Sequence, residues 1–120
     1  MKKIALIDDE KVILDLYSRV LSQEFEVLTA INGEEGLELI EKEKPSLILV
    51  DIRMPRMDGL AMIEEMKKKK LFDVPVLIMT NFSDDEKVAR AIELGAKEYI
   101  LKAKTTPVEV LERVKSYLQD

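Results

Sequence analysis

The chain has 120 residues, of which 47% are apolar and 36% charged, a composition typical of one globular domain with a sizeable core. It contains no cysteine and no histidine, which excludes disulfides, thiol and imidazole chemistry and the usual zinc sites, and leaves oxygen ligands for any metal. The net charge of −5 argues against nucleic acid as a direct partner, and no apolar run suits a signal peptide or a membrane span, so we expect a cytoplasmic protein.

Five short apolar segments without internal charge recur along the chain. Runs of this length are typical of strands that are buried on both faces of a parallel sheet. They comprise residues 4–7, 27–30, 47–50, 76–79 and 99–101.

Each of these segments is followed by apolar residues spaced three and four apart, the pattern of an amphipathic helix. The five helical patterns run from Ile13 to Leu21, Leu37 to Ile40, Ile63 to Met66, Val88 to Ile92 and Val108 to Leu118. Asn32 with Glu35, Ser83 with Glu86, and Thr106 with Glu109 have capping-box spacing, Pro107 suits a first helical position, and Gly95 suits a C-terminal cap. Strict β-α alternation predicts an α/β fold, with a parallel sheet covered by helices on both faces.

Polar residues follow four of the five predicted strands. Asp8 and Asp9 follow the first, Asp51 the third, Thr80 the fourth and Lys102 the fifth. Taken singly, each is weak evidence, because a lone Asp such as Asp9 is also a common helix cap. Together they predict a site, since ligands bind at the carboxyl ends of the strands in such sheets.

The chemistry of this set points to a phosphoryl group. Neighbouring strands lie roughly 4.8 Å apart, so Asp8, Asp9 and Asp51 crowd together if the first and third strands are neighbours. Crowded carboxylates either take up a proton or bind a cation, and hard oxygen ligands favour Mg²⁺. Lys102 can reach back across the sheet, so a metal and an ammonium would flank Asp51 and stabilise a phosphoryl group that is passed to it.

These residues resemble a known family. The pattern IDDE, then LVDIRMPRMDG, then MT, then Y-x-x-K is similar to the receiver domain of two-component response regulators, over residues 3–119. The resemblance implies a single receiver domain over residues 1–120, comparable to a stand-alone chemotaxis regulator. It also implies the flavodoxin-like (βα)5 fold, with a five-stranded parallel sheet of order 2-1-3-4-5.

The same resemblance implies a role for each acidic residue at the strand ends. Asp51 would be the phosphoacceptor. Asp9, Asp51 and the backbone carbonyl of Arg53 would bind Mg²⁺ directly, and Asp8 would act largely through water.

Further residues match the switch of the family. Lys102 would pair with the phosphoryl group, and Thr80 would donate a hydrogen bond to it and move on activation. Tyr99 resembles the aromatic that turns inward with this movement, although a plain strand aromatic is the alternative. Pro55 and Gly59 match the turn after the phosphoacceptor, where Pro55 would stiffen the loop and Gly59 would free the backbone to enter the helix.

The chain departs from the family pattern at two positions. The residue after Lys102 is Ala103 rather than a proline that follows a cis peptide, and a non-proline cis bond costs about 3 kcal/mol. Asn81 replaces a very small residue after Thr80. We hypothesise that Asn81, together with Phe82 and Arg53, slows dephosphorylation.

The resemblance also implies partners. A chain without histidine needs a histidine kinase or a histidine phosphotransfer protein as its phosphoryl donor. Output would come through residues 83–94, the strand around Tyr99 and residues 106–118, and the module would catalyse its own transfer and a slow autodephosphorylation. The sequence ends with the fifth helix and shows no DNA-binding module, and it leaves open whether phosphorylation leads to dimers.

Three other functions remain as alternatives. A phosphatase of the haloacid dehalogenase type needs a D-x-D motif, whereas Asp8 and Asp9 are adjacent. A flavodoxin needs a phosphate loop rich in glycine and hydroxyl groups, whereas DDEKV follows the first strand here. A degenerate receiver would bind a partner without being phosphorylated, although all five key positions are filled.

Overall fold

The fold is a five-stranded parallel sheet between two layers of helices. The computed structural model describes residues 1–71, 73–81 and 86–119. The strands are β1 (Lys3–Ile7), β2 (Glu26–Ala30), β3 (Leu47–Asp51), β4 (Val76–Thr80) and β5 (Glu98–Leu101). They pair in parallel in the order β2-β1-β3-β4-β5, which confirms the predicted fold class.

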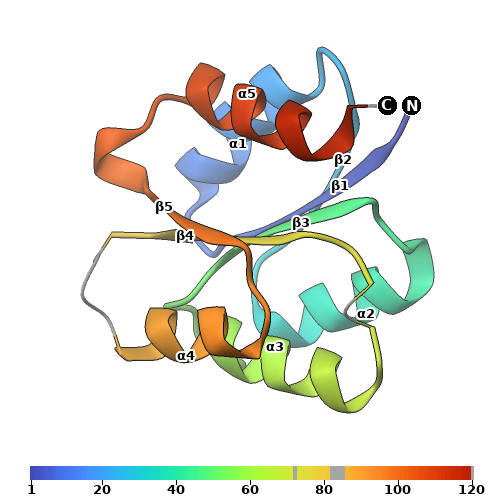
Figure 1. The fold of residues 1–120 in the computed structure, drawn as a ribbon. Helices are drawn as coiled ribbons and strands as arrows, with labels where there is room; N and C mark the ends of the chain where they lie inside the picture. The colour runs from blue at the N-terminus through green and yellow to red at the C-terminus, as the bar shows by residue number, and fades with distance from the viewer. Residues whose placement is uncertain (72, 82–85, 120) are drawn as a thin grey trace.

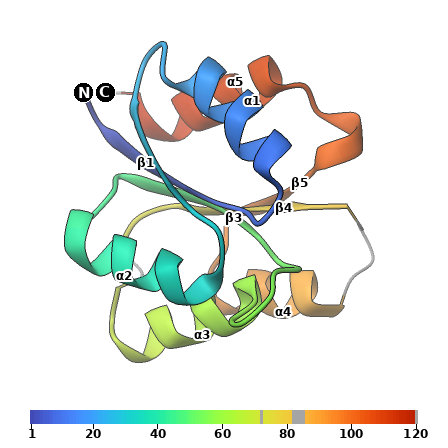
Figure 2. The same ribbon diagram turned by 180° about the vertical axis from the view of Figure 1, so that it is seen from behind.

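The helices are α1 (Lys11–Leu21), α2 (Gly33–Glu43), α3 (Gly59–Lys68), α4 (Glu86–Leu94) and α5 (Pro107–Leu118), and a short 3-10 turn, η1 (Lys102–Lys104), precedes α5. In Figure 1, α1 and α5 cover one face of the sheet, and α2, α3 and α4 cover the other. Figure 2 shows the same division from behind. None of the helices in the described part of the chain is long and apolar enough to cross a membrane.

The alternation of side chains along each central strand produces two separate cores. In β1, Ile4 and Leu6 pack with the α1 and α5 residues, whereas Ala5 and Ile7 pack on the opposite side with α2 and α3. All five residues of β3 and of β4 are buried, as their continuous apolar sequence predicts.

The edge strands correct one part of the prediction. In β2 only Ala30 is fully buried, and in β5 only Ile100 is. An apolar run was expected to mean burial on both faces, but β2 and β5 lie at the two edges of the sheet. A strand with a single neighbour is covered less completely, so sequence alone overestimated its burial.

The helix ends agree with the sequence signals where they are described. Thr106 forms a complete capping box with Glu109, and the Asn32 side chain accepts a hydrogen bond from the Glu35 backbone. Gly95 ends α4 with a φ of 129°, a conformation that glycine adopts without strain. The predicted pairing of Ser83 with Glu86 lies outside the described residues.

Candidate functional site

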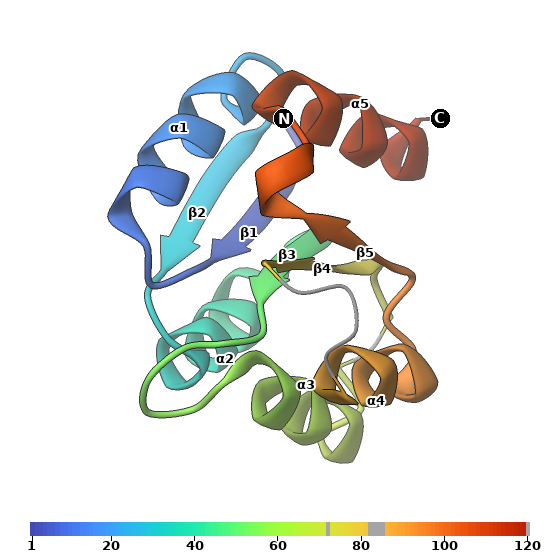
Figure 3. The ribbon, with the colours of Figure 1, turned by 90° about the vertical axis from the view of Figure 1, so that its left-hand side faces the viewer.

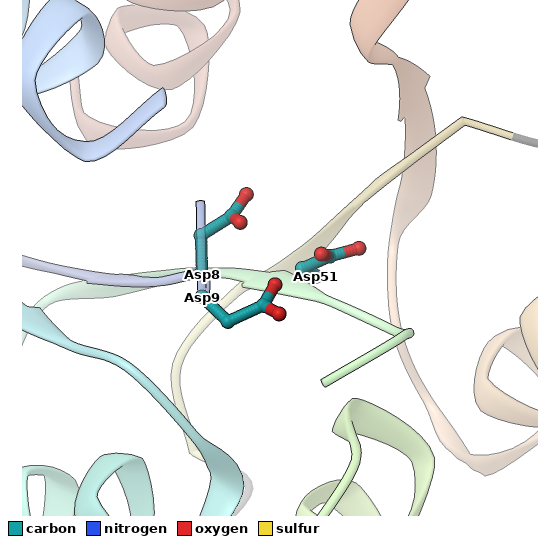
Figure 4. A group of neighbouring side chains, drawn as sticks. All are labelled: Asp8, Asp9 and Asp51. Carbon is teal, nitrogen blue, oxygen red and sulfur yellow. The ribbon is translucent and has the colours of Figure 1, made fainter. Parts of the chain in front are cut away.

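Three carboxylates meet where β1 and β3 end. Because β1 pairs directly with β3, Asp8 and Asp9 follow one strand beside Asp51, the last residue of the other. A carboxylate oxygen from each residue lies within 4.8 Å of one from both others. Figure 3 looks onto these strand ends, and Figure 4 shows the three side chains gathered there. The predicted convergence of the acidic residues is therefore present.

Their exposure differs sharply. Asp8 is fully buried and Asp51 is 4% exposed, whereas Asp9 is open to solvent. The alternative role of Asp9 as a helix cap is absent, because the N-cap of α1 is Glu10. The Glu10 backbone N–H instead donates to Asp8 Oδ1 at 2.9 Å, which fixes the Asp8 carboxylate at the base of the site.

Lys102 supplies the positive charge of the site. It follows β5, two strands away from β3, and its Nζ reaches back to lie 3.0 Å from Asp51 Oδ2 and 2.7 Å from Asp8 Oδ2. Both contacts are ion pairs, and the one with Asp51 Oδ2 is also a hydrogen bond. Glu10 Oε1 lies 3.6 Å from the same ammonium. The predicted reach of this side chain across the sheet is confirmed.

Burial and charge shift the ionisation of the cluster. Desolvation and, after it, the Asp8 carboxylate raise the pKa of Asp51 to about 6, although Lys102 and the Arg53 backbone N–H offset part of the rise. Desolvation also raises the pKa of Asp8, against the opposing effect of Lys102. Burial alone would lower the pKa of Lys102, but its two carboxylate partners more than compensate and raise it, so this side chain remains an ammonium.

The cluster has the chemistry of a divalent-cation site. It offers hard oxygen ligands that lie close together, and one of them, Asp8 Oδ2, is buried without a hydrogen bond. The pKa values of Asp8 and Asp51 are both raised, mainly by burial, so a bound cation would stabilise their ionised forms. These residues therefore fit Mg²⁺, which prefers carboxylates and keeps positions for water or phosphate oxygens.

The loop after β3 is held close to Asp51. The Gly59 backbone N–H donates to the Ile52 carbonyl at 2.9 Å, and a Cβ added at Gly59 would lie 2.2 Å from the Asp51 carbonyl oxygen. This corrects the reason expected for Gly59. The residue does not have a positive φ and need not free the backbone, because what the fold requires is the absence of a side chain beside Asp51.

The remaining predicted site residues lie at the ends of β4 and β5. Thr80 is the last residue of β4 and is fully buried, one position beyond the Met79 that pairs with Asp51. Tyr99 lies in β5 opposite Ile78 and is 41% exposed, so its ring is on the surface. Arg53 follows Asp51 by two residues and Asn81 directly follows Thr80, and both side chains are exposed. Phe82 lies outside the described residues.

The peptide between Lys102 and Ala103 is not cis, which resolves the question that this departure raised. Residues 102–104 form the turn η1 instead, and Lys102 still reaches Asp51. The side chain is therefore delivered without the cis-proline geometry of the family pattern.

Sequence reasoning missed one contact near the site. Lys87, in the first turn of α4, lies with its Nζ 2.5 Å from Asp58 Oδ2. The Asp58 side chain also caps α3, because its Oδ1 accepts a hydrogen bond from the Ala61 backbone at 2.9 Å. No sequence spacing links Asp58 to a lysine 29 residues away.

Comparisons with known proteins show the family of the chain. The sequence model described as "Response regulator receiver domain" matches residues 4–115. The chain is 37% identical over 119 residues to the alkaline phosphatase synthesis transcriptional regulatory protein PhoP of Bacillus subtilis (strain 168), a match that covers 98% of this chain and 49% of that protein. The chain thus spans about half the length of the curated relatives that it matches.

Solved structures give the same result. The CheY-like receiver domain protein of Methanospirillum hungatei JF-1 is 32% identical with a TM-score of 0.87, and the match covers 97% of this chain and 92% of that one. The BeF3-activated receiver domain of DrrB, a protein of Thermotoga maritima, is 33% identical with a TM-score of 0.85, over 100% of this chain and 99% of that one. The chain belongs to the response regulator receiver domain family of two-component signalling systems.

Proposed function

We propose that this receiver module is a switch whose phosphoacceptor is Asp51. A receiver domain is a signalling module that works through phosphorylation. The observation that carries the assignment to Asp51 is its position as the last residue of β3, where its Oδ2 accepts a hydrogen bond from Lys102. It also lies beside the two other acids that could share a cation with it.

The transfer itself needs an ionised Asp51. One of its carboxylate oxygens attacks the phosphorus of a donor, an O–P bond forms, and the bond from phosphorus to the donor breaks with its electron pair leaving on the donor. The Lys102 ammonium pairs with a phosphoryl oxygen, and the Thr80 hydroxyl donates a hydrogen bond to another. Both groups then stabilise the negative charge that develops on the phosphoryl oxygens in the transition state.

Mg²⁺ is the cofactor that these residues would hold. Asp9, Asp51 and the backbone carbonyl of Arg53 are the proposed direct ligands, and Asp8 would act largely through water. When bound, the cation neutralises charge on the phosphoryl oxygens.

The donor would be a histidine kinase or a histidine phosphotransfer protein, because this chain has no histidine of its own. The module would also lose its phosphoryl group by a slow reaction with water. Its output would come through the face formed by α4, β5 and α5, where Ile92, Tyr99 and Val108 are large apolar side chains that remain exposed. Tyr99 is the proposed switch residue of this face.

A titration with Mg²⁺ and beryllofluoride, a phosphoryl mimic, tests this proposal by amide NMR. We expect Mg²⁺ to shift the resonances of Asp9, Asp51 and Arg53. Addition of beryllofluoride should then shift Thr80 and the α4-β5-α5 face, and Asp51→Asn should abolish this second response. A wild-type protein that shows neither response would overturn the proposal.

A further inference from the structure

Among the described residues, an ion pair joins the β3-α3 loop, residues 52–58, to α4. Lys87 Nζ lies 2.5 Å from Asp58 Oδ2, with the two side chains 41% and 22% exposed. The contact joins the first turn of α4 to the residue that ends the loop. It is therefore placed to relate the position of a helix to the geometry of the loop.

Backbone contacts in turn link Asp58 to Asp51. Its Oδ1 accepts a hydrogen bond from Ala61 and so fixes the start of α3. The next residue, Gly59, donates its N–H to the Ile52 carbonyl and approaches the Asp51 carbonyl more closely than any other amino acid could. Gly59 thus connects the two ends of the loop, because it follows Asp58 in the chain and is hydrogen-bonded to Ile52. A movement of Asp58 therefore changes the path of residues 52–58.

We propose that Lys87 is a positioning residue: through Asp58 it holds the β3-α3 loop so that Asp51 and the Arg53 carbonyl face a divalent cation together. This inference rests on the proposed function of the site. It adds α4 to the elements that shape the cation site, and it makes the ion pair the connection between the cation site and that helix.

The alternative is a purely electrostatic effect of Lys87 on a nearby cation. The two roles predict different changes in Mg²⁺ affinity for the two substitutions. If only charge matters, Lys87→Met removes a positive charge and strengthens Mg²⁺ binding, whereas Asp58→Asn removes a negative charge and weakens it. If position matters, both substitutions break the same contact and both weaken binding. Asp58→Asn is suitable because its amide oxygen can still accept the Ala61 hydrogen bond.

Calorimetric titration with Mg²⁺ alone distinguishes the two roles. We expect Lys87→Met and Asp58→Asn each to weaken binding by about two- to fivefold, the range for a partly exposed ion pair. The double variant should lose no more than either single variant, and Lys87→Arg should retain wild-type affinity. Opposite shifts, or a Lys87→Met protein with wild-type affinity, would overturn the positioning role.

The chain offers a matched control at the other end of the same two helices. Lys67 of α3 donates from its Nζ to the Leu94 carbonyl of α4 at 3.3 Å. Lys67→Met also removes a lysine that joins α3 to α4, but it does so away from the strand ends. It should leave Mg²⁺ affinity unchanged, and a loss equal to that of Lys87→Met would show that general loosening of the helix pair is responsible.

Amide hydrogen exchange in the metal-free protein gives a second, independent measurement. Lys87→Met and Asp58→Asn should both speed exchange at residues 52–58, and Lys67→Met should not. If the wild type binds no Mg²⁺, the proposed cation site is wrong, and the exchange data alone decide whether Lys87 holds the loop. Unchanged exchange in Lys87→Met would overturn that role.

Discussion

Burial of the ionised Asp51 side chain lowers the stability of the folded protein. It is 4% exposed and lies beside a second buried carboxylate, with Lys102 as the cation that both contact. Its pKa of about 6 lies above the ordinary value of about 3.9 for an unfolded chain. Between these two values the folded state binds a proton that the unfolded state has lost, so stability falls as the pH rises through this window.

Asp51→Asn should therefore stabilise the metal-free protein at high pH. We expect a gain of about 3 kcal/mol at pH 8, which follows from a pKa difference of roughly two units at about 1.4 kcal/mol per unit. The gain should vanish near pH 3, below the pKa of Asp51 in both states, where both states of the wild type are largely protonated. Urea denaturation with a chelator at the two pH values measures it, and the exposed Asp73→Asn is the control. A gain that is independent of pH would contradict the assigned pKa.

Lys102→Met should have the opposite effect. It leaves Asp8 and Asp51 buried without their cation, and removing one partner of a buried ion pair typically costs about 3–5 kcal/mol. Adding Asp51→Asn to this variant should recover much of the loss, since one of the two stranded charges is then gone. Urea denaturation at pH 8 measures both effects. A single variant as stable as the wild type would show that Lys102 does not balance these acids.

Asn81→Ala tests the hypothesis that residue size beside the phosphoryl group controls access of water. Asn81 directly follows Thr80 and is exposed, so its side chain can cover the site without filling the core. We expect the smaller residue to shorten the lifetime of the aspartyl phosphate severalfold. The decay of phosphorylated protein, followed by mass spectrometry, gives this lifetime, with Arg53→Ala as a parallel variant. An unchanged lifetime removes Asn81 from the account.

At the scale of elements, the close approach of α3 to β3 makes Gly59 more sensitive to an added side chain than Gly36. A methyl group at Gly59 would meet the backbone of Asp51 and Ile52, whereas one at Gly36 would meet the flexible ends of Ile7 and Met62. Gly59→Ala should cost more than the roughly 1–3 kcal/mol of ordinary overpacking and should also weaken Mg²⁺ binding. Gly36→Ala should stay within that range and leave Mg²⁺ binding intact. Equal effects at the two sites would contradict this difference.

The elements show how far sequence can predict this structure. Apolar runs and capping signals placed all five strands and helices, because both patterns record local backbone geometry and burial. The same patterns could not identify β2 and β5 as edge strands with partial exposure, since this depends on strand order. The same patterns could not predict the close approach at Gly59 either, because it depends on how α3 packs against the end of β3.

The same limit applies to the candidate site. Asp8, Asp9, Asp51 and Lys102 were predictable because parallel strands deliver the residues that follow them to one edge of the sheet. The ion pair between Lys87 and Asp58 was not, because it joins two helix starts whose separation is set by tertiary packing.

At the scale of the whole molecule, the helical layers cover the two faces of the sheet, and the buried acids Asp8 and Asp51 lie where β1 and β3 end. The central strands β1, β3 and β4 are closed on both faces, and their carboxyl ends carry the acids and Thr80. β5, a strand of the proposed output face, is separated from β3 and Asp51 by β4 alone. The strand order therefore keeps the proposed phosphoacceptor one strand away from the proposed output face.

The most direct test of the account is the site of phosphoryl transfer. The intact protein is incubated with acetyl phosphate and Mg²⁺, with or without a chelator, and the product is analysed by mass spectrometry of the whole chain and its peptides. The account predicts one added phosphoryl group on Asp51, which is lost with the chelator and absent in Asp51→Asn. Labelling that persists at the same level in Asp51→Asn, or an unlabelled wild type, would contradict it.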